Sequence, residues 1–188
     1  TEEIGEAAFY GPKLDVNVKP AIGNEYTLST CQLDFCLPAK FDLKYVDKDG
    51  EKKTPVVLHR AILGSLDRFM AYILEETKGA LPTWLAPTQV KVIPVNPELH
   101  SEYGEEITKL LEANNIRVEL DDRNEKLGYR LREAQTEKVP YTLILGDQEK
   151  ENSTISYRLF GQKDTTTVSK EEFVNLIKEE IDTKALRK

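Results

Sequence analysis

The chain has 188 residues, with 26 Lys and Arg against 33 Asp and Glu and a formal net charge of -7. Its 39% hydrophobic and 31% charged content fits a globular protein and excludes a disordered one. No apolar run approaches the roughly 18 residues that span a bilayer, and no basic-then-apolar leader opens the chain. Two cysteines do not make a disulfide framework. We therefore expect a cytoplasmic protein with reduced thiols and no membrane partner.

The acidic balance argues against general nucleic-acid binding. If RNA binds, it has to bind at a local patch and through specific contacts. The chain opens at Thr1 without an initiator Met, which we interpret as a cut through a longer protein.

Residues 1–85 have the pattern of an α+β unit. Apolar residues alternate with polar ones at 14–18 and again at 41–45, and strands are also predicted at 26–35 and 55–59. Residues 47–50 predict a hairpin turn. A helix is predicted over residues 60–78, with one apolar stripe. That stripe consists of Ile62, Leu66, Phe69 and Ile73. Two prolines in residues 81–87 predict an ordered, extended connector, so we place the boundary at 85/86.

Residues 86–188 alternate strand and helix and predict a compact α/β domain. Strands are expected at 89–95, 117–120, 141–145 and 155–160, and helices at 98–113 and 127–137. This order predicts a parallel core sheet with right-handed crossovers. Ser169, with Glu172 three residues later, predicts a capping box at the start of a last helix.

Individual residues leave their roles open. His59 ends an apolar strand, where a histidine is more often structural than catalytic or metal-binding. Cys31 and Cys36 lie five positions apart, and an odd offset in a strand places them on opposite faces and disfavours a shared zinc site.

Gly64, placed in the predicted helix, costs about 1 kcal/mol relative to Ala. It indicates a close approach by another backbone or by a ligand. Arg68, one turn later, can clamp a phosphate there, and the alternative is close packing beside a surface arginine. Residues 122–132 form a polar strand-to-helix loop at the end of a parallel strand, where open α/β sheets bind ligands. The alternative is a helix cap with a solvated face.

Several stretches, in order along the chain, are similar to the threonyl-tRNA synthetases. They are GEAAFYGPK at 5–13, STCQLDF at 29–35, HRAILGSLDRF at 59–69, WLAP at 84–87, DRNEKLG at 122–128 and VPY at 139–141. The resemblance implies the C-terminal piece of a threonine–tRNA ligase. Residues 1–85 would be the end of a class II catalytic domain, an antiparallel sheet with the motif 3 helix. Residues 86–188 would be a compact anticodon-binding α/β domain with a mainly parallel sheet.

The resemblance also implies roles for residues of the catalytic part. Arg68 would contact the ATP phosphates, and Gln32 and Ser65 would line the adenylate pocket. Tyr10 and Lys13 would face the bound threonine and adenylate. His59 would be one of three protein ligands of a zinc ion that holds the amino and hydroxyl groups of threonine, and valine lacks that hydroxyl.

In the second part, the residues that fall where the family reads anticodon bases are Asn124, Arg132, Glu149 and Arg158. The bases would be the G and U shared by all threonine anticodons. Residues 159–161 stand where the family often has further arginines, which fits the acidic net charge.

The family's other zinc ligands, its motif 1 dimer interface and its motif 2 arginine lie upstream. The resemblance therefore implies that the intact enzyme is a homodimer that uses ATP with magnesium, threonine and tRNA-Thr. We expect the chain alone to form no threonyl-adenylate. The alternatives are a stand-alone RNA-binding or accessory module, a sister synthetase such as the prolyl or glycyl enzyme, and a generic α/β interaction protein.

Overall fold

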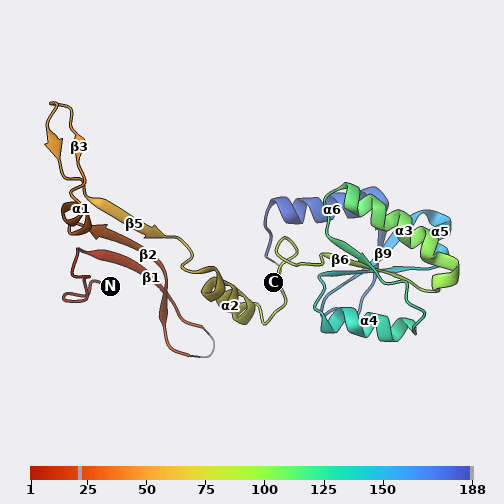
Figure 1. The fold of residues 1–188 in the computed structure, drawn as a ribbon. Coiled ribbons are helices and arrows are strands. Elements are labelled where there is room, and N and C mark those ends of the chain that lie inside the picture. Colours follow the sequence, from red (N-terminus) through yellow and green to blue (C-terminus); the bar gives the residue numbers. More distant parts are fainter. Residues whose placement is uncertain (21–22, 187–188) are drawn as a thin grey trace. The chain divides into compact units, whose positions relative to one another are not determined.

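A computed structural model describes residues 1–20 and 23–186 (Figure 1). The chain divides into two compact units, Thr1–Glu76 and Thr77–Lys188. Within the described residues, no helix is long and apolar enough to cross a membrane.

The first unit contains a three-stranded antiparallel sheet in the order β1-β2-β5. Its strands are β1 (Lys13–Val18), β2 (Tyr26–Asp34) and β5 (Val57–Ala61). The remaining elements are α1 (Leu37–Lys40), the antiparallel pair β3 (Tyr45–Val46) and β4 (Lys52–Lys53), and α2 (Leu66–Glu76). The predicted turn between β3 and β4 is confirmed, because Gly50 N donates to Asp47 O at 3.1 Å. The predicted strand at 41–45 is wrong except at Tyr45.

The predicted start of the helix at residue 60 is also wrong. Residues 60 and 61 extend β5, and α2 begins at Leu66. Gly64 lies in the turn before the helix, with a φ of +67° that disfavours other residues. A Cβ atom on Gly64 would lie 2.8 Å from Leu28 O. The glycine therefore does permit a close backbone approach, but in a turn, so it does not share a helix face with Arg68.

The sheet of the first unit has one polar and one apolar face, because side chains alternate along each strand. Leu14, Val16 and Leu58 lie on the apolar face and remain exposed. The predicted stripe of α2 is only half-buried at Phe69 and Ile73, and Leu66 is 74% exposed. Within the described helix α2 no residue is fully buried.

The second unit contains a five-stranded mixed sheet in the order β10-β9-β8-β6-β7. Its strands are β6 (Val90–Pro94), β7 (Val118–Leu120), β8 (Tyr141–Leu145), β9 (Thr154–Leu159) and β10 (Thr166–Ser169). Its helices are α3 (Pro97–Ala113), α4 (Leu127–Thr136), α5 (Asp147–Asn152) and α6 (Lys170–Asp182). Strands β7 and β8 run parallel to β6, which confirms the predicted parallel core. Strands β9 and β10 continue the sheet antiparallel.

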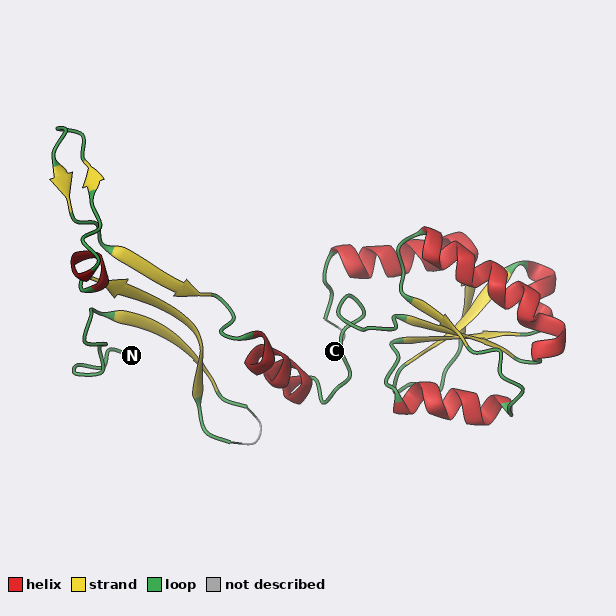
Figure 2. Ribbon diagram, viewed as in Figure 1, coloured by secondary structure: helices red, strands yellow, loops and turns green. Residues whose placement is uncertain are grey.

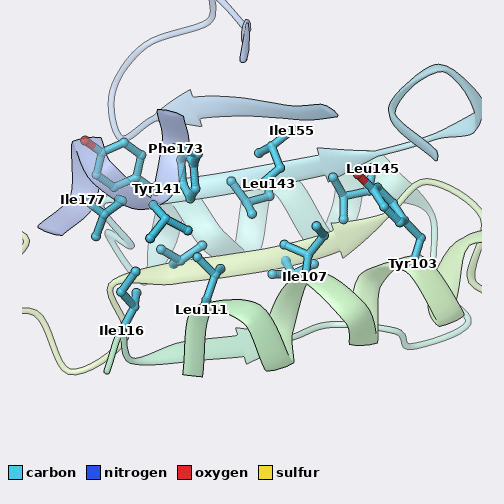
Figure 3. Packing of buried hydrophobic residues seen from close by; sticks show 13 residues of the cluster. Tyr103, Ile107, Leu111, Ile116, Tyr141, Leu143, Leu145, Ile155, Phe173 and Ile177 are labelled. Carbon is cyan, nitrogen blue, oxygen red and sulfur yellow. The ribbon is translucent and has the colours of Figure 1, made fainter. Parts of the chain in front are cut away.

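The hydrophobic core of the second unit lies between the sheet and helices α3 and α6 (Figure 3). Ile107 and Leu111 of α3 pack there with Leu143 of β8 and with Phe173 and Ile177 of α6. Helix α4 covers the opposite face of the sheet (Figure 2). Two described elements of the second unit were not predicted from the sequence, α5 and β10. Both are short and polar, so neither has an apolar period to detect.

The connector packs on the second unit. The Gln89 side chain donates to Thr83 O at 2.9 Å, and Arg117 donates to Trp84 O at 3.0 Å and to Ala86 O at 2.8 Å. These bonds confirm that the connector is ordered, but residues 83–85 form a turn, so the prediction of an extended segment is wrong there. The same bonds also explain why the contacts divide the chain after Glu76, ahead of the sequence-based boundary at 85/86.

Candidate functional site

The polar face of the first sheet brings together three of the residues singled out in the sequence. Gln32 on the central strand β2 is paired with Lys13 of β1 on one side and with His59 of β5 on the other. Cross-strand partners project from the same face. The fold therefore places an amide, an ammonium and an imidazole in one row across the sheet.

Tyr10 joins this row from the segment before β1. Its hydroxyl donates to Gln32 Oε1 at 2.6 Å, and its ring meets the His59 ring edge-on, with centroids 6.4 Å apart. A pocket of about 600 Å³ is lined by Tyr10, Gln32, Asp34 and His59 among others. It offers donors and acceptors beside an aromatic ring, which suits a small polar ligand.

His59 has a buried carboxylate as its partner. Its Nε2 lies 2.9 Å from Asp34 Oδ2, and Asp34 also accepts from the backbone N–H groups of Cys36 and Leu37 at 2.9 Å. Burial by itself raises the pKa of Asp34, but these N–H groups and the imidazole outweigh it and lower the pKa. The sequence analysis missed Asp34. Its position, two residues after Gln32 on the same strand face, could have indicated it.

Lys13 is held by an acidic neighbour on its own strand. Its Nζ pairs with Asp15 at 2.7 Å, and Asp15 accepts from Thr30 Oγ1 at 2.6 Å. The bonds from Lys13 and Thr30 lower the pKa of Asp15. The ion pair with Asp15 thus holds the Lys13 ammonium group in place at the edge of the polar row.

Arg68 and Ser65 lie together, and Arg68 lines a different pocket from Gln32 and His59. Arg68 N donates to Ser65 Oγ at 3.4 Å, and the guanidinium sits 5.8 Å from the centre of the Tyr26 ring. Arg68 also donates to Thr27 O at 3.4 Å. The structure therefore does not bring Arg68 into the Tyr10–Gln32–His59 row.

The described residues do not by themselves fit a zinc ion. Nowhere in the described ranges do three His, Cys, Asp or Glu residues group so that they could hold a metal. Cys31 and Cys36 are both free thiols, and Cys31 pairs with Arg60, on the face opposite His59. At this site the first unit supplies one imidazole, that of His59, and its carboxylate partner Asp34.

In the second unit, Asn124 lies on an exposed loop between β7 and α4. Beside it, Arg123 forms a two-point ion pair with the buried Asp121, with contacts of 2.8 and 2.7 Å, and a further short contact to Glu133. The alternative of a helix cap with a solvated face is only partly met, because the described N-cap residue, Lys126, forms no side-chain cap bond, whereas residues 122–126 are exposed. Arg132 is exposed on α4.

Arg158 lies on the sheet face that α4 covers. Lys91 on this face pairs with Glu137, the C-cap residue directly after α4, at 2.6 Å. Thr142 pairs with Lys91 on one side and with Arg158 on the other. Within the described part of the chain, Thr142 Oγ1 and Arg158 Nε are buried without a hydrogen-bond partner.

Glu149 is tied to the same sheet from helix α5. Its Oε1 accepts from Ser156 Oγ at 2.6 Å and its Oε2 from Gly146 N at 2.9 Å. Each carboxylate oxygen has a further lone pair. Ser156 and Arg158 are two residues apart on β9 and therefore share one sheet face, while Asn124 lies on the loop before α4 and Arg132 on α4 itself.

The comparisons agree with this two-part arrangement. The class II tRNA synthetase core domain (G, H, P, S and T) matches residues 2–77, and the anticodon binding domain matches residues 89–180. A threonine–tRNA ligase of Oceanobacillus iheyensis is 54% identical over 99% of this chain, and one of Staphylococcus carnosus is 58% identical over 95%. The chain belongs to the threonyl-tRNA synthetase family.

A solved relative shows the same fold. The crystal structure of the RNA binding domain of threonyl-tRNA synthetase from Cryptosporidium parvum Iowa II is 32% identical, with a TM-score of 0.83, over 93% of this chain and 44% of that chain. The chain spans 29% and 28% of the two curated threonine–tRNA ligases. The family resemblance and the fold predicted from the sequence are thereby confirmed.

Proposed function

We propose that the chain recognises the anticodon of tRNA-Thr and is part of a threonine–tRNA ligase. The main support for this proposal is that one chain combines the Tyr10–Gln32–His59 row with an anticodon-binding fold. A stand-alone RNA-binding module has no use for this row, so the row favours the enzyme over the module. In this proposal, residues 1–85 are the end of the catalytic domain and residues 86–188 bind the anticodon.

The proposed readers of the G and U bases are Asn124, Arg132, Glu149 and Arg158. An amide can both donate to and accept from a base edge, a guanidinium donates, and a carboxylate accepts from base N–H groups. The exposure of Asn124 and Arg132 supports this role, as does the buried Arg158 Nε, for which the described residues offer no partner.

The proposed roles in the catalytic part are those that the family resemblance implies, for residues in the polar row and for Ser65 and Arg68 outside it. Tyr10 and Lys13 face threonine and its adenylate, Gln32 and Ser65 line the adenylate pocket, and Arg68 contacts the phosphates of ATP, which is bound with magnesium. His59 supplies one zinc ligand, oriented by Asp34, and the intact enzyme supplies the others. A bound zinc ion would select threonine over valine through the hydroxyl group. We further propose a homodimeric intact enzyme in the cytoplasm.

The test of anticodon recognition is a titration of the whole chain with two RNA hairpins. One is the anticodon stem-loop of a threonine tRNA, and the other has its G and U exchanged. We expect tighter binding of the first hairpin and loss of this preference in Asn124→Ala and Arg132→Ala. Equal binding of both hairpins by the unchanged chain would overturn the proposal.

ATP–pyrophosphate exchange with threonine tests the catalytic part. We expect no exchange by this chain alone, because a single imidazole and an incomplete sheet do not hold the reactants. A robust threonine-dependent rate would show that these residues suffice and would contradict the expectation.

A further inference from the structure

Arg130 is the largest side chain among the fully buried residues of the described structure, with 0% of its surface exposed. Its guanidinium donates to Asp121 O at 2.8 Å, to Glu125 O at 3.2 Å and to Val95 O at 3.3 Å. All three described acceptors are backbone carbonyls. A buried cation is costly unless its donors are satisfied, so this arrangement fixes where the three carbonyls lie.

The three carbonyls lie before, beside and after the tip of the Asn124 loop. Val95 directly follows β6, and Asp121 directly follows β7. Both are at the carboxyl ends of parallel strands, where open α/β sheets bind ligands. Glu125 lies on the far side of Asn124. Arg130 therefore holds the chain immediately before and after the loop tip.

A second anchor acts on the same loop from its exposed side. The carbonyl of Asp121 is held by Arg130, while its carboxylate is held by Arg123, which also reaches Glu133 on α4. The bonds from Arg123 lower the pKa of Asp121. Since the described N-cap residue of α4 makes no side-chain cap, these arginines replace the usual means of fixing a loop at a helix start.

We propose that Arg130 is a positioning residue for anticodon recognition, because it holds residues 121–125 in the conformation that presents the Asn124 amide. The inference rests on the proposed role of Asn124 in base reading. A loop that is ordered before binding does not have to lose conformational freedom in the complex. Arg130 itself reaches no base, since it is fully buried.

The test uses the whole chain and the two hairpins that differ in their G and U. Arg130→Lys keeps the charge but cannot serve three carbonyls from a planar group. We expect its preference for the cognate hairpin to fall about tenfold, the equivalent of about 1.4 kcal/mol. In the Asn124→Ala background we expect Arg130→Lys to cause no further loss, because both changes act through the same amide.

Leu111→Ala is the matched control. It opens the core on the opposite face of the sheet and lowers the free energy of unfolding by about 2–5 kcal/mol, but it leaves the loop intact. We expect its folded fraction to keep the full preference. A purely structural Arg130 would behave like Leu111→Ala. If Arg130→Lys does not fold, Arg130→Gln, which keeps two amide donors without the buried charge, takes its place.

The outcomes separate the two proposals. If Asn124→Ala leaves the preference unchanged, the proposed function of Asn124 fails, and this inference fails with it. If Asn124→Ala removes the preference but the Arg130 variant keeps it, only the positioning role fails. Additive losses from the two substitutions would also overturn the positioning role.

Discussion

The hydroxyl of Ser156 donates to Glu149 Oε1 over 2.6 Å, which ties helix α5 to strand β9. The other carboxylate oxygen accepts from the N–H of Gly146 at the start of the helix. Burial by itself raises the pKa of Glu149, but these two bonds, with the backbone N–H of Glu149 and the charge of His100, outweigh it and lower the pKa. The carboxylate is therefore a fixed anion at the edge of the proposed base-reading face.

Ser156→Ala removes one of these two bonds from the buried side of Glu149. We expect the free energy of unfolding to fall by about 1–2 kcal/mol and the pKa of Glu149 to rise toward its ordinary value. Urea denaturation and an NMR titration of the carboxyl carbon measure the two effects. Thr165→Ser, at an exposed position, is the control and should change neither. An unchanged pKa in Ser156→Ala would show that the bond does not hold the anion.

The stability of the second unit should fall in acid. The pKa values of Asp121, Glu149 and Glu172 are lowered by bonds from Arg123, from Ser156 and Gly146, and from Ser169, respectively. As the pH falls below about 4.5, the unfolded chain takes up protons on these groups before the folded chain does. The contribution of these carboxylates to the free energy of unfolding is therefore complete above this pH and decreases below it.

Urea denaturation at a series of pH values from 7 to 3 measures this dependence. Glu172→Gln should reduce its slope, because one of the contributing groups no longer titrates. A free energy of unfolding that stays constant across the series would contradict the assigned pKa directions.

Gly64→Ala tests the close approach between the turn before α2 and strand β2. A Cβ atom there meets Leu28 O, and the positive φ is strained as well. We expect faster hydrogen exchange at the β2 amides. Gly50→Ala is the matched control, since Gly50 has a φ of +80° but nothing within 4 Å of its Cβ position. Gly50→Ala has the backbone strain of a positive φ but no steric clash at its Cβ atom. It should therefore affect only the β3–β4 hairpin. Equal effects of the two variants on β2 would show that φ alone matters.

Zinc retention tests whether the first unit by itself holds the zinc ion for which His59 is a proposed ligand. With one imidazole in the first unit and no metal cluster among the described residues, the chain should not retain zinc after dialysis. Metal analysis of the dialysed protein measures this, and His59→Ala should give the same value as the unchanged chain. Retention of one zinc per chain that is lost in His59→Ala would mean that His59 binds zinc with residues outside the expected set.

Much of the second unit could be predicted because its periods are regular. Residues 141–145 were predicted as a strand with the limits of β8, and the Ser169–Glu172 capping box is present as expected. The short α5 and β10 could not be found, since tertiary contacts such as the Glu149–Ser156 bond stabilise them. In the first unit, the apolar spacing predicted a helix that begins at residue 60. Residues 60 and 61 instead pair with β2 and belong to β5.

The sequence by itself determined the family, the order of the elements and the residues proposed to carry the chemistry. These depend on local spacing and on residue type, which a single chain displays directly. Only the tertiary structure decided which of those residues meet. Tyr10, Gln32 and His59 lie in one row beside the buried Asp34, and Arg68 lies outside this row. Three backbone carbonyls accept hydrogen bonds from Arg130. Such contacts join residues far apart in the chain, and strand register and burial fix them.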